Sequence, residues 1–339
     1  MNKVLKYAAL CCLGFSLAVS CIRSEEELCD TYVRFVYDYN IGGADMYTPG
    51  IDLFHKQATK VDLFIFDGQG VYIDRITETA SSGTFAQDFR ITLPRNLPQD
   101  AQMVVWSGLY DEFYSVTDMV KGQSRMEDLL VEAKTSAANI LDKDIKPLWN
   151  GAVLGNKSLV KYINDVITIN LVKDTNNIRI NLEVVDEDNN ILSDEEFSIQ
   201  ITSANKAYRY NNDIVSNTDM IQYRPFYTGF DENTGVAAEL KLLRLMGDRQ
   251  SVLKITHEDR DEVILEKDIV PYLYASRLSI YTSMGKQEYL DREDTYRIIV
   301  FLTYKPGPGP GEGQYIATEI RINEWYVRFH DEGLDPVRP

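Results

Sequence analysis

The stretch that decides the fold is Asn177-Ile178-Arg179-Ile180-Asn181-Leu182-Glu183-Val184. Apolar side chains occupy every second position, and polar side chains fill the positions between them. This period of two is that of a β-strand with one face on a core and the other face in water. The stretch lies near the middle of a chain of 339 residues.

Strand-like runs continue in both directions from this stretch, and they are rich in the β-branched and aromatic residues that suit a pleated sheet. Toward the N-terminus they are 32–39, 61–66, 71–73, 89–93, 102–106 and 166–171, and toward the C-terminus 196–201, 239–245, 251–256, 295–304 and 316–329. Asp67-Gly68-Gln69-Gly70 predicts a hairpin turn, because Asp-Gly tolerates a positive φ. A short helix is predicted within 126–138, and 269–284 predicts either a helix or a long loop.

Many short strands separated by turn signals favour β-sandwiches over a parallel sheet. A break at Lys173-Asp174-Thr175 divides the strand-like part of the chain almost in half. We therefore expect a mainly β protein with two tandem β-sandwich domains, residues 31–172 and 173–339. A signal peptide over residues 1–20 and a linker over residues 21–30 precede them.

The last strand-like run changes its parity part-way along. One face of an extended strand would carry Ile316, Ile320 and Ile322, which have even numbers. The opposite face would carry Trp325, Val327 and Phe329, which have odd numbers. Such a switch predicts a β-bulge near Asn323-Glu324. A Pro/Gly loop over residues 306–313 precedes the run and makes a terminal hairpin with residues 295–304.

Composition excludes several classes of protein. Hydrophobic residues are 44% and charged residues 26%, which is ordinary for a globular chain and unlike disordered, collagenous or coiled-coil proteins. Asp and Glu total 52 against 35 Lys and Arg, so the formal net charge is −17. A surface this acidic repels phosphate backbones, and we expect no nucleic-acid partner.

The N-terminus carries an export signal. Lys3 and Lys6 precede an uncharged run, residues 7–19, which is shorter than the roughly 20 residues that span a bilayer. The run ends in Leu17-Ala18-Val19-Ser20-Cys21, which resembles the lipobox of bacterial lipoproteins. That resemblance implies cleavage between Ser20 and Cys21 and acylation of Cys21, which would tether the protein to outer-membrane lipid. The alternative is an ordinary secretory signal with an incidental cysteine.

An acidic run follows the lipobox. Ser24, Glu25, Glu26 and Glu27 resemble the surface-export signal of Bacteroidetes lipoproteins, and the alternative is a solvated linker. Cys11 and Cys12 leave with the signal peptide and Cys21 takes the lipid. Cys29 is then a single thiol, so we expect no intramolecular disulfide.

Motifs for catalysis are missing from the sequence. The three histidines, His55, His257 and His330, lie far apart, and the residues after His257 lack the second histidine of H-E-x-x-H. There is no G-x-S-x-G elbow and no P-loop. The run 186–190 is similar to a calcium loop, but Ile191 and Phe197 stand where that loop needs Gly and Glu. We expect no enzyme activity, no cofactor and no metal.

Several segments, taken in order, resemble the FimB-like anchor lipoproteins of Bacteroidales type V fimbriae. These segments are 33–40, 61–67, 171–180, 287–296 and 322–328, and they follow the lipobox. The resemblance covers nearly the whole mature chain. One departure is Glu324, because the family often has Gly before the terminal Trp.

The resemblance implies two transthyretin-like β-sandwiches in a protein that is part of a fimbrium. It further implies a non-enzymatic basal anchor, held in the outer membrane and bound to a fimbrial shaft subunit of the same system. The acidic run at residues 24–27, as an export signal, would place the protein on the cell exterior. Such subunits polymerise when one supplies a strand to the sheet of the next.

We therefore consider the C-terminal strand as a subunit interface, and its candidate residues are Ile316, Ile320, Ile322, Trp325, Val327 and Phe329. The alternative is a permanent core strand of the second domain. At the level of function, the alternatives are a stand-alone surface lipoprotein that binds glycan or host protein, and an accessory or tip subunit.

Overall fold

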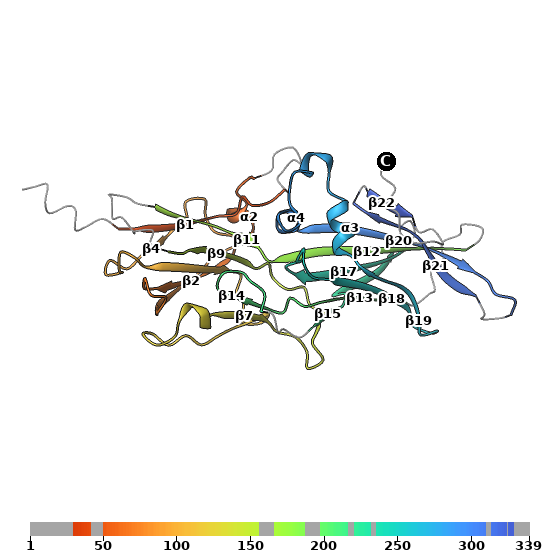
Figure 1. Cartoon of the computed structure of the whole chain (residues 1–339), viewed down its shortest axis with the longest axis horizontal. Coiled ribbons are helices and arrows are strands. Elements are labelled where there is room, and N and C mark those ends of the chain that lie inside the picture. The colour runs from red at the N-terminus through yellow and green to blue at the C-terminus, as the bar shows by residue number, and fades with distance from the viewer. Residues whose placement is uncertain are drawn as a thin grey trace, which may run out of the picture.

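The computed structural model is 48% strand and 9% helix, so the expectation of a mainly β sandwich protein is confirmed. The structure describes residues 30–41, 50–155, 166–186, 197–215, 220–231, 235–309, 313–323 and 325–328. The signal peptide, Cys21, the 24–27 run and Cys29 lie outside these residues. The molecule is elongated, and the chain enters at one end of its long axis (Figure 1).

Two sheets form the end of the molecule that the chain enters first. The three-stranded sheet has the order β10 (Val166–Asn170), β1 (Tyr32–Val36) and β4 (Ile91–Thr92). The five-stranded sheet has the order β11 (Val172–Lys173), β9 (Trp149–Val153), β5 (Gln102–Ser107), β2 (Lys60–Phe66) and β3 (Tyr72–Thr79). Val33 and Phe35 of β1 pack with Leu63 and Ile65 of β2 in the core between these sheets.

Strand β2 is buried on both faces, which explains why it reads as a continuous apolar run rather than an alternation. Leu63 and Ile65 face the core described above. Phe64 and Phe66 face a second, larger core, to which β6 (Tyr114–Val116) and β7 (Leu130–Ala133) also contribute. The five-stranded sheet is therefore a middle layer.

Two further sheets form the other end of the molecule. The six-stranded sheet has the order β16 (Tyr227–Asp231), β17 (Gly235–Leu243), β12 (Thr175–Val185), β20 (Thr295–Lys305), β21 (Gln314–Ile322) and β22 (Trp325–Arg328). The five-stranded sheet opposite has the order β19 (Glu262–Asp268), β18 (Ser251–His257), β13 (Phe197–Ser203), β15 (Ile221–Tyr223) and β8 (Ile140–Leu141). The apolar face of β12, which includes Ile178, Ile180 and Leu182, lies in the core.

Strand pairing crosses the boundary expected at residues 172 and 173. β14 (Ala207–Arg209) pairs with β7, and β15 pairs with β8. The larger core likewise contains side chains from both halves of the sequence. The division into residues 31–172 and 173–339 stays a prediction.

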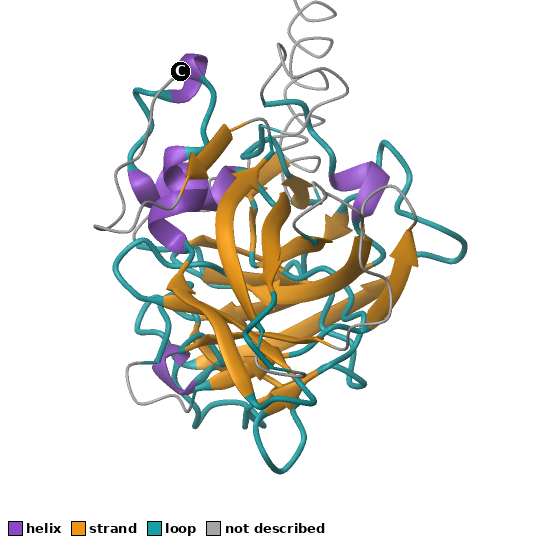
Figure 2. Cartoon of the chain, turned by 90° about the vertical axis from the view of Figure 1, so that its right-hand side faces the viewer, coloured by secondary structure: helices purple, strands orange, loops and turns teal. Residues whose placement is uncertain are grey.

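The described helices are short and lie toward the margin of the strands (Figure 2). They are α2 (Phe54–Gln57), α3 (Val270–Ala275), α4 (Lys286–Arg292) and the 3-10 turns η1 (Met126–Asp128) and η2 (Ser279–Tyr281). The short helix expected within 126–138 is present only as the single 3-10 turn η1, and β7 follows it. For residues 269–284 the sequence predicts either a helix or a long loop, and the helix is confirmed by α3.

The prediction of a bulge near Asn323-Glu324 is wrong. β21 ends at Ile322 and β22 runs back antiparallel beside it, with Ile322 opposite Trp325. Asn323 has a φ of 53°, a left-handed conformation that Asn tolerates in hairpin turns. The change of parity therefore marks a reversal of the chain. A register shift does occur earlier, where Phe301 pairs with Glu319 but Leu302 pairs with Ala317.

Candidate subunit interface

The hairpin of β21 and β22 closes one edge of the six-stranded sheet (Figure 1). Trp325 and Val327 lie on β22, whose backbone alone is described, and Phe329 lies outside the described residues. In the described part of the sheet, β22 has a strand on one side only. Among the described strands nothing pairs with its other side, so that side is the candidate position for a further strand.

The candidate isoleucines of β21 do not share one environment. Ile320 is 3% exposed and Ile322 is 1% exposed, and both side chains lie in the larger core. Ile316 is half-buried, because the register shift at Thr318 places it on the opposite face from Ile320. Ile320 and Ile322 therefore act as fixed core residues, so that contact with another subunit would fall to β22 and to the outer face of the sheet.

Asn323 ties the hairpin to the strand beyond it. Its main-chain N–H donates to the Arg297 carbonyl at 2.8 Å, and its Oδ1 accepts the Arg297 N–H at 3.0 Å. The turn is therefore bonded to β20 as well as to its own two strands. This holds the edge strand at a fixed position in the sheet.

The opposite edge of the same sheet was not predicted from the sequence. It is β16, where Tyr227 is 51% exposed and Phe230 is 45% exposed. The run is short and contains Gly229, which weakens a strand signal. Its aromatic content was the available clue.

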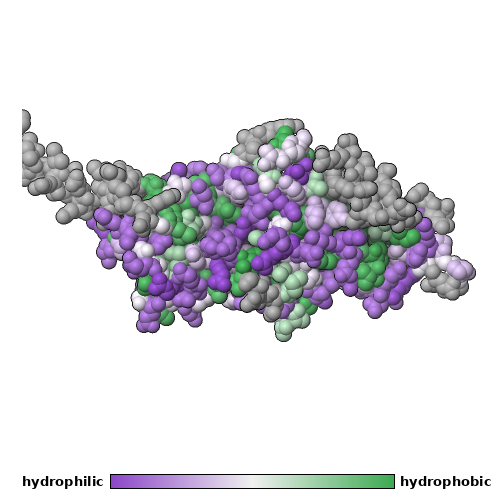
Figure 3. Space-filling model, viewed as in Figure 1, coloured by the Kyte–Doolittle hydropathy of each residue, from purple (hydrophilic) through white to green (hydrophobic). Residues whose placement is uncertain are grey.

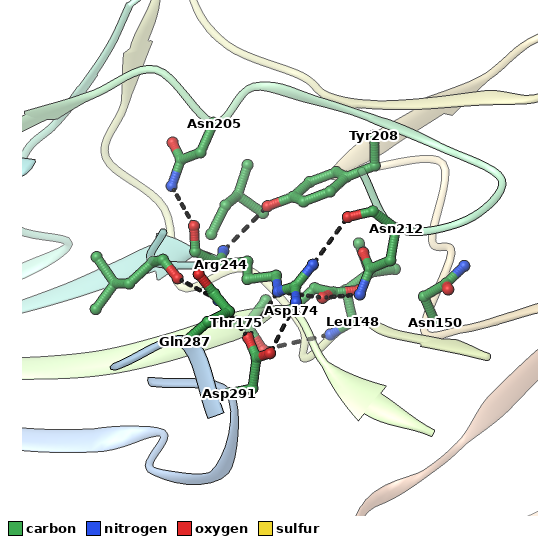
Figure 4. Close-up of polar contacts among 12 residues, drawn as sticks. Leu148, Asn150, Asp174, Thr175, Asn205, Tyr208, Asn212, Arg244, Gln287 and Asp291 are labelled. Carbon is green, nitrogen blue, oxygen red and sulfur yellow. Dashed lines mark hydrogen bonds and ion pairs between the residues drawn. The ribbon is translucent and has the colours of Figure 1, made fainter. Parts of the chain in front are cut away.

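A buried polar cluster lies where the two halves of the chain meet (Figure 4). Arg244, just after β17, donates from Nε and Nη2 to the two carboxylate oxygens of Asp291 on α4, at 2.7 and 2.8 Å. Its Nη1 donates to the Asn212 carbonyl at 2.8 Å. The Asn212 amide in turn donates to Asp174 Oδ1 at 2.8 Å. Asp174 follows β11 and is completely buried.

Burial shifts the ionisation of this cluster. Burial raises the pKa of Asp174 to about 7, although the Arg244 charge and the Asn212 hydrogen bond oppose that rise. Burial likewise raises the pKa of the neighbouring Glu293 to about 7. For Arg244, burial lowers the pKa, but the Asp291 hydrogen bond and the charges of Asp174 and Asp291 outweigh it, so the net shift is upward. Arg244 is thus a permanent cation, whereas Asp174 titrates near neutrality.

Three more contacts join the first half of the chain to the region around α4. Lys173 Nζ forms an ion pair with Asp294. The Ile41 N–H donates to the Arg292 carbonyl at 3.1 Å, and the Arg292 guanidinium lies over the Tyr39 ring at 3.9 Å. Together with the Asp174 cluster, they make a polar joint, which we define as Lys173, Asp174, Arg244, Asp291 and Asp294.

Two hollows lie in the N-terminal half. The first, of about 420 Å³, is lined mainly by polar side chains, among them Arg34, Asp52, His55, Asp88 and Arg90. The second, of about 650 Å³, is lined by Thr59, Tyr110, Phe113 and Lys146 among others. The face shown in Figure 3 is mostly hydrophilic, with small separate apolar areas. Among the described residues, no group of His, Cys, Asp and Glu has the arrangement of a metal site.

Residues 25–331 match the family of fimbrillin-A associated anchor proteins Mfa1 and Mfa2. The chain belongs to this Mfa2 anchor family. The comparison with curated protein sequences gave no match. The family resemblance seen in the sequence is thereby confirmed.

Solved structures agree with the assignment to the Mfa2 family. A candidate polysaccharide-binding protein from Bacteroides thetaiotaomicron is 27% identical, with a TM-score of 0.75 over 90% of this chain and 99% of its own. A candidate adhesin from the same species is 25% identical, with a TM-score of 0.70 over 89% and 99%. The fimbrial anchor protein Mfa2 from Porphyromonas gingivalis is 17% identical and shares the fold, with a TM-score of 0.64 over 89% and 99%.

Membership of the Mfa2 family gives this protein a fimbria-associated, structural role at the cell surface, in association with other fimbrial subunits. In the part of the chain that the structure describes, every helix is too short or too polar to cross a bilayer.

Proposed function

We propose that this protein is the lipid-tethered basal anchor of a fimbrium, which attaches the fimbrial shaft to the outer membrane through Cys21. The observation that carries this proposal is the combination of an Mfa2-family match over residues 25–331 with the Leu17-to-Cys21 lipobox directly upstream of it. Ser24, Glu25, Glu26 and Glu27 would then direct the protein to the cell exterior. The shaft subunit of the same fimbrial system is the expected partner.

The shape of the molecule supports this proposal. The chain enters at one end of the long axis, and β20, β21 and β22 extend toward the other end (Figure 1). A lipid at Cys21 would thus hold one end at the membrane. The edge strand β22 lies well away from the strands that the chain forms first. An anchor needs this separation between its lipid and its partner.

We further propose that β22 and the outer face of β21 contact the shaft. Addition of a strand to a sheet edge uses main-chain hydrogen bonds for affinity and alternate side-chain pockets for specificity. Ile316, Trp325, Val327 and Phe329 are the candidate contact residues, whereas Ile320 and Ile322 support the strand from the core.

The test of the tether follows Cys21. Cells that express the wild type, Cys21→Ala or the control Cys29→Ala are grown with an alkyne fatty acid, and fimbriae are then measured on cells and in the medium. We expect Cys21→Ala to lose the label and release fimbriae, and Cys29→Ala to do neither. Loss of label with fimbriae still on the cell would exclude the anchor role.

A second candidate function is glycan binding by a stand-alone surface lipoprotein. It is favoured by the polar hollow between Asp52 and Arg90 and by the relative described as a candidate polysaccharide-binding protein. Glycan-array binding by the soluble chain, abolished by Arg90→Ala, would support it. In that case deletion of the gene would leave fimbriae on the cell.

A further inference from the structure

Strands β1 and β10 form a parallel pair near the end where the chain enters the fold. Five residue pairs are in register, from Tyr32 opposite Val166 to Val36 opposite Asn170. β1 is the first described strand after the N-terminus. β10 leads directly through β11 into β12, which lies inside the six-stranded sheet.

The pair is held by main-chain bonds on a buried base. The Leu171 N–H donates to the Val36 carbonyl at 2.8 Å. Main-chain groups alternate in direction along a strand, so those of Arg34 and Tyr32 also face β10. The side chains between them, Val33 and Phe35, are 0% and 1% exposed. Sliding β1 past β10 therefore breaks several hydrogen bonds and exposes core at the same time.

The direction of pulling decides how such a pair responds to tension. If the lipid holds the N-terminus and the fibre pulls on the six-stranded sheet, β1 is drawn toward its N-terminal end. β10 is drawn toward its C-terminal end, through β12. Because the two strands are parallel, these forces act along the strands in opposite directions, and all the ladder bonds share the load. An antiparallel pair under the same forces would open one bond at a time.

We infer that the parallel β1–β10 pair is the mechanical clamp of this protein, the element that resists tension between the membrane and the fibre. The inference deepens the proposed anchor function and rests on it for the direction of the force. No covalent shortcut joins β1 to β10 among the described residues, so the load bypasses the chain between them, about 130 residues, only while the pair holds.

The polar joint carries the load onward from β10. Directly after β11, Lys173 pairs with Asp294, and Asp174 is held by Asn212. The Asp174 N–H also donates to the Leu148 carbonyl at 2.7 Å. These contacts fix the connection between β10 and β12 to both ends of the molecule. Tension should therefore pass along the strands rather than peel β11 from its neighbours.

The test is force spectroscopy on the mature chain with Cys29→Ser. One peptide handle is placed at residue 21 and another between Pro308 and Gly309, which lie at the far hairpin. A disulfide is introduced across the pair with Arg34→Cys and Thr168→Cys. These residues are in register, and the Arg34 Nε lies 2.8 Å from Thr168 Oγ1 on the exposed face, so the bridge leaves the core untouched.

Under reducing conditions we expect the first rupture to release the chain between the two strands. Under oxidising conditions that rupture should be lost, and the total extension should shorten by about 450 Å, because 134 residues are bypassed. Forced unfolding reports the unfolding rate and not the equilibrium stability, so rupture force and extension are compared rather than melting curves. A first rupture that keeps its force and length after oxidation would overturn the proposal.

A second pulling geometry is the control. With the first handle moved to the exposed loop between Ser81 and Ser82, the force no longer crosses the β1–β10 pair. Oxidation should then leave the force of the first rupture unchanged, although the released length shortens because residue 81 lies inside the ring that the disulfide closes. A change in that force would show that the disulfide acts on the whole fold. Failure of the anchor role is a separate result, because Cys21→Ala would then leave fimbriae on the cell while the clamp still held in the purified chain.

Discussion

Asp174 shows how a single residue at the joint can depend on pH. Its carboxyl group is completely buried, and burial raises its pKa from 3.8 to about 7. Between these two values the folded state keeps a proton that the unfolded state has released. Folding is therefore favoured at the acid end of this window, and stability falls as the pH rises through it. Glu293 shifts in the same direction.

The prediction is that Asp174→Asn flattens this dependence. From about pH 5 to about pH 8 the free energy of unfolding of the wild type should fall by at most roughly 3 kcal/mol more than that of the variant. Urea unfolding at the two pH values measures it. Asn keeps an oxygen that can accept the Asn212 hydrogen bond, and Glu293→Gln reports the second carboxyl group. Parallel losses in wild type and Asp174→Asn would show that Asp174 is ionised throughout.

The polar joint could not be predicted from the sequence. The sequence predicts a break between domains at Lys173-Asp174-Thr175, where one series of strand-like runs ends and a second begins. The partners that make these residues buried and paired lie far along the chain, at Asn212, Arg244 and Asp291. The pattern of neighbouring residues carries no information about pairs between residues so far apart in the sequence. The export signal and lipobox, in contrast, are local motifs that sequence alone can propose.

At the scale of elements, alternation located most strands well. Residues 177–184 became β12, residues 61–66 became β2, and residues 295–304 became β20. Alternation failed where a change of parity has two explanations, a bulge or a hairpin. At Asn323 the chain reverses, and the deciding fact is the contact with Arg297 in a neighbouring strand. That contact is invisible in a single run of residues.

The hairpin turn gives the second prediction. Asn323→Gly keeps the positive φ but loses the Oδ1 acceptor, so it should cost about 1 kcal/mol. Asn323→Val should cost more, since a β-branched residue also resists φ of 53°. Thermal unfolding and hydrogen exchange of residues 319–322 measure the effect. Asn323→Asp keeps the acceptor and is the matched control; equal losses in all three variants would contradict the role of the Arg297 bond.

At the scale of the whole molecule, the order of strands in the sheets departs from their order in the sequence. β8 and β7 come from the first half of the chain, yet they pair with β15 and β14 from the second half. β12 and β20 are parallel neighbours although more than 100 residues separate them. Periodicity predicts that a segment is a strand, but it does not say which strand lies beside it. The mainly β class followed from the sequence, and the interleaved topology did not.

The last prediction separates the interface from the core. A chain that ends at Asn323 lacks β22 but keeps Ile320 and Ile322, which are buried and paired with β20. It should fold, with a melting temperature close to that of the wild type, and reach the membrane. If β22 contacts the shaft, this variant should release fimbriae into the medium.

A chain that ends at Thr318 is the contrasting variant. It loses both isoleucines from the core, and each such loss costs about 2–5 kcal/mol, so it should misfold. Removal of residues 336–339 alone is the control for a shortened C-terminus and should change neither property. Circular dichroism and fimbrial counts on cells distinguish the three chains. If the chain that ends at Asn323 is folded and still retains its fimbriae, the contact with the shaft lies elsewhere, and the exposed aromatic residues of β16, at the opposite edge of the same sheet, become the next surface to test.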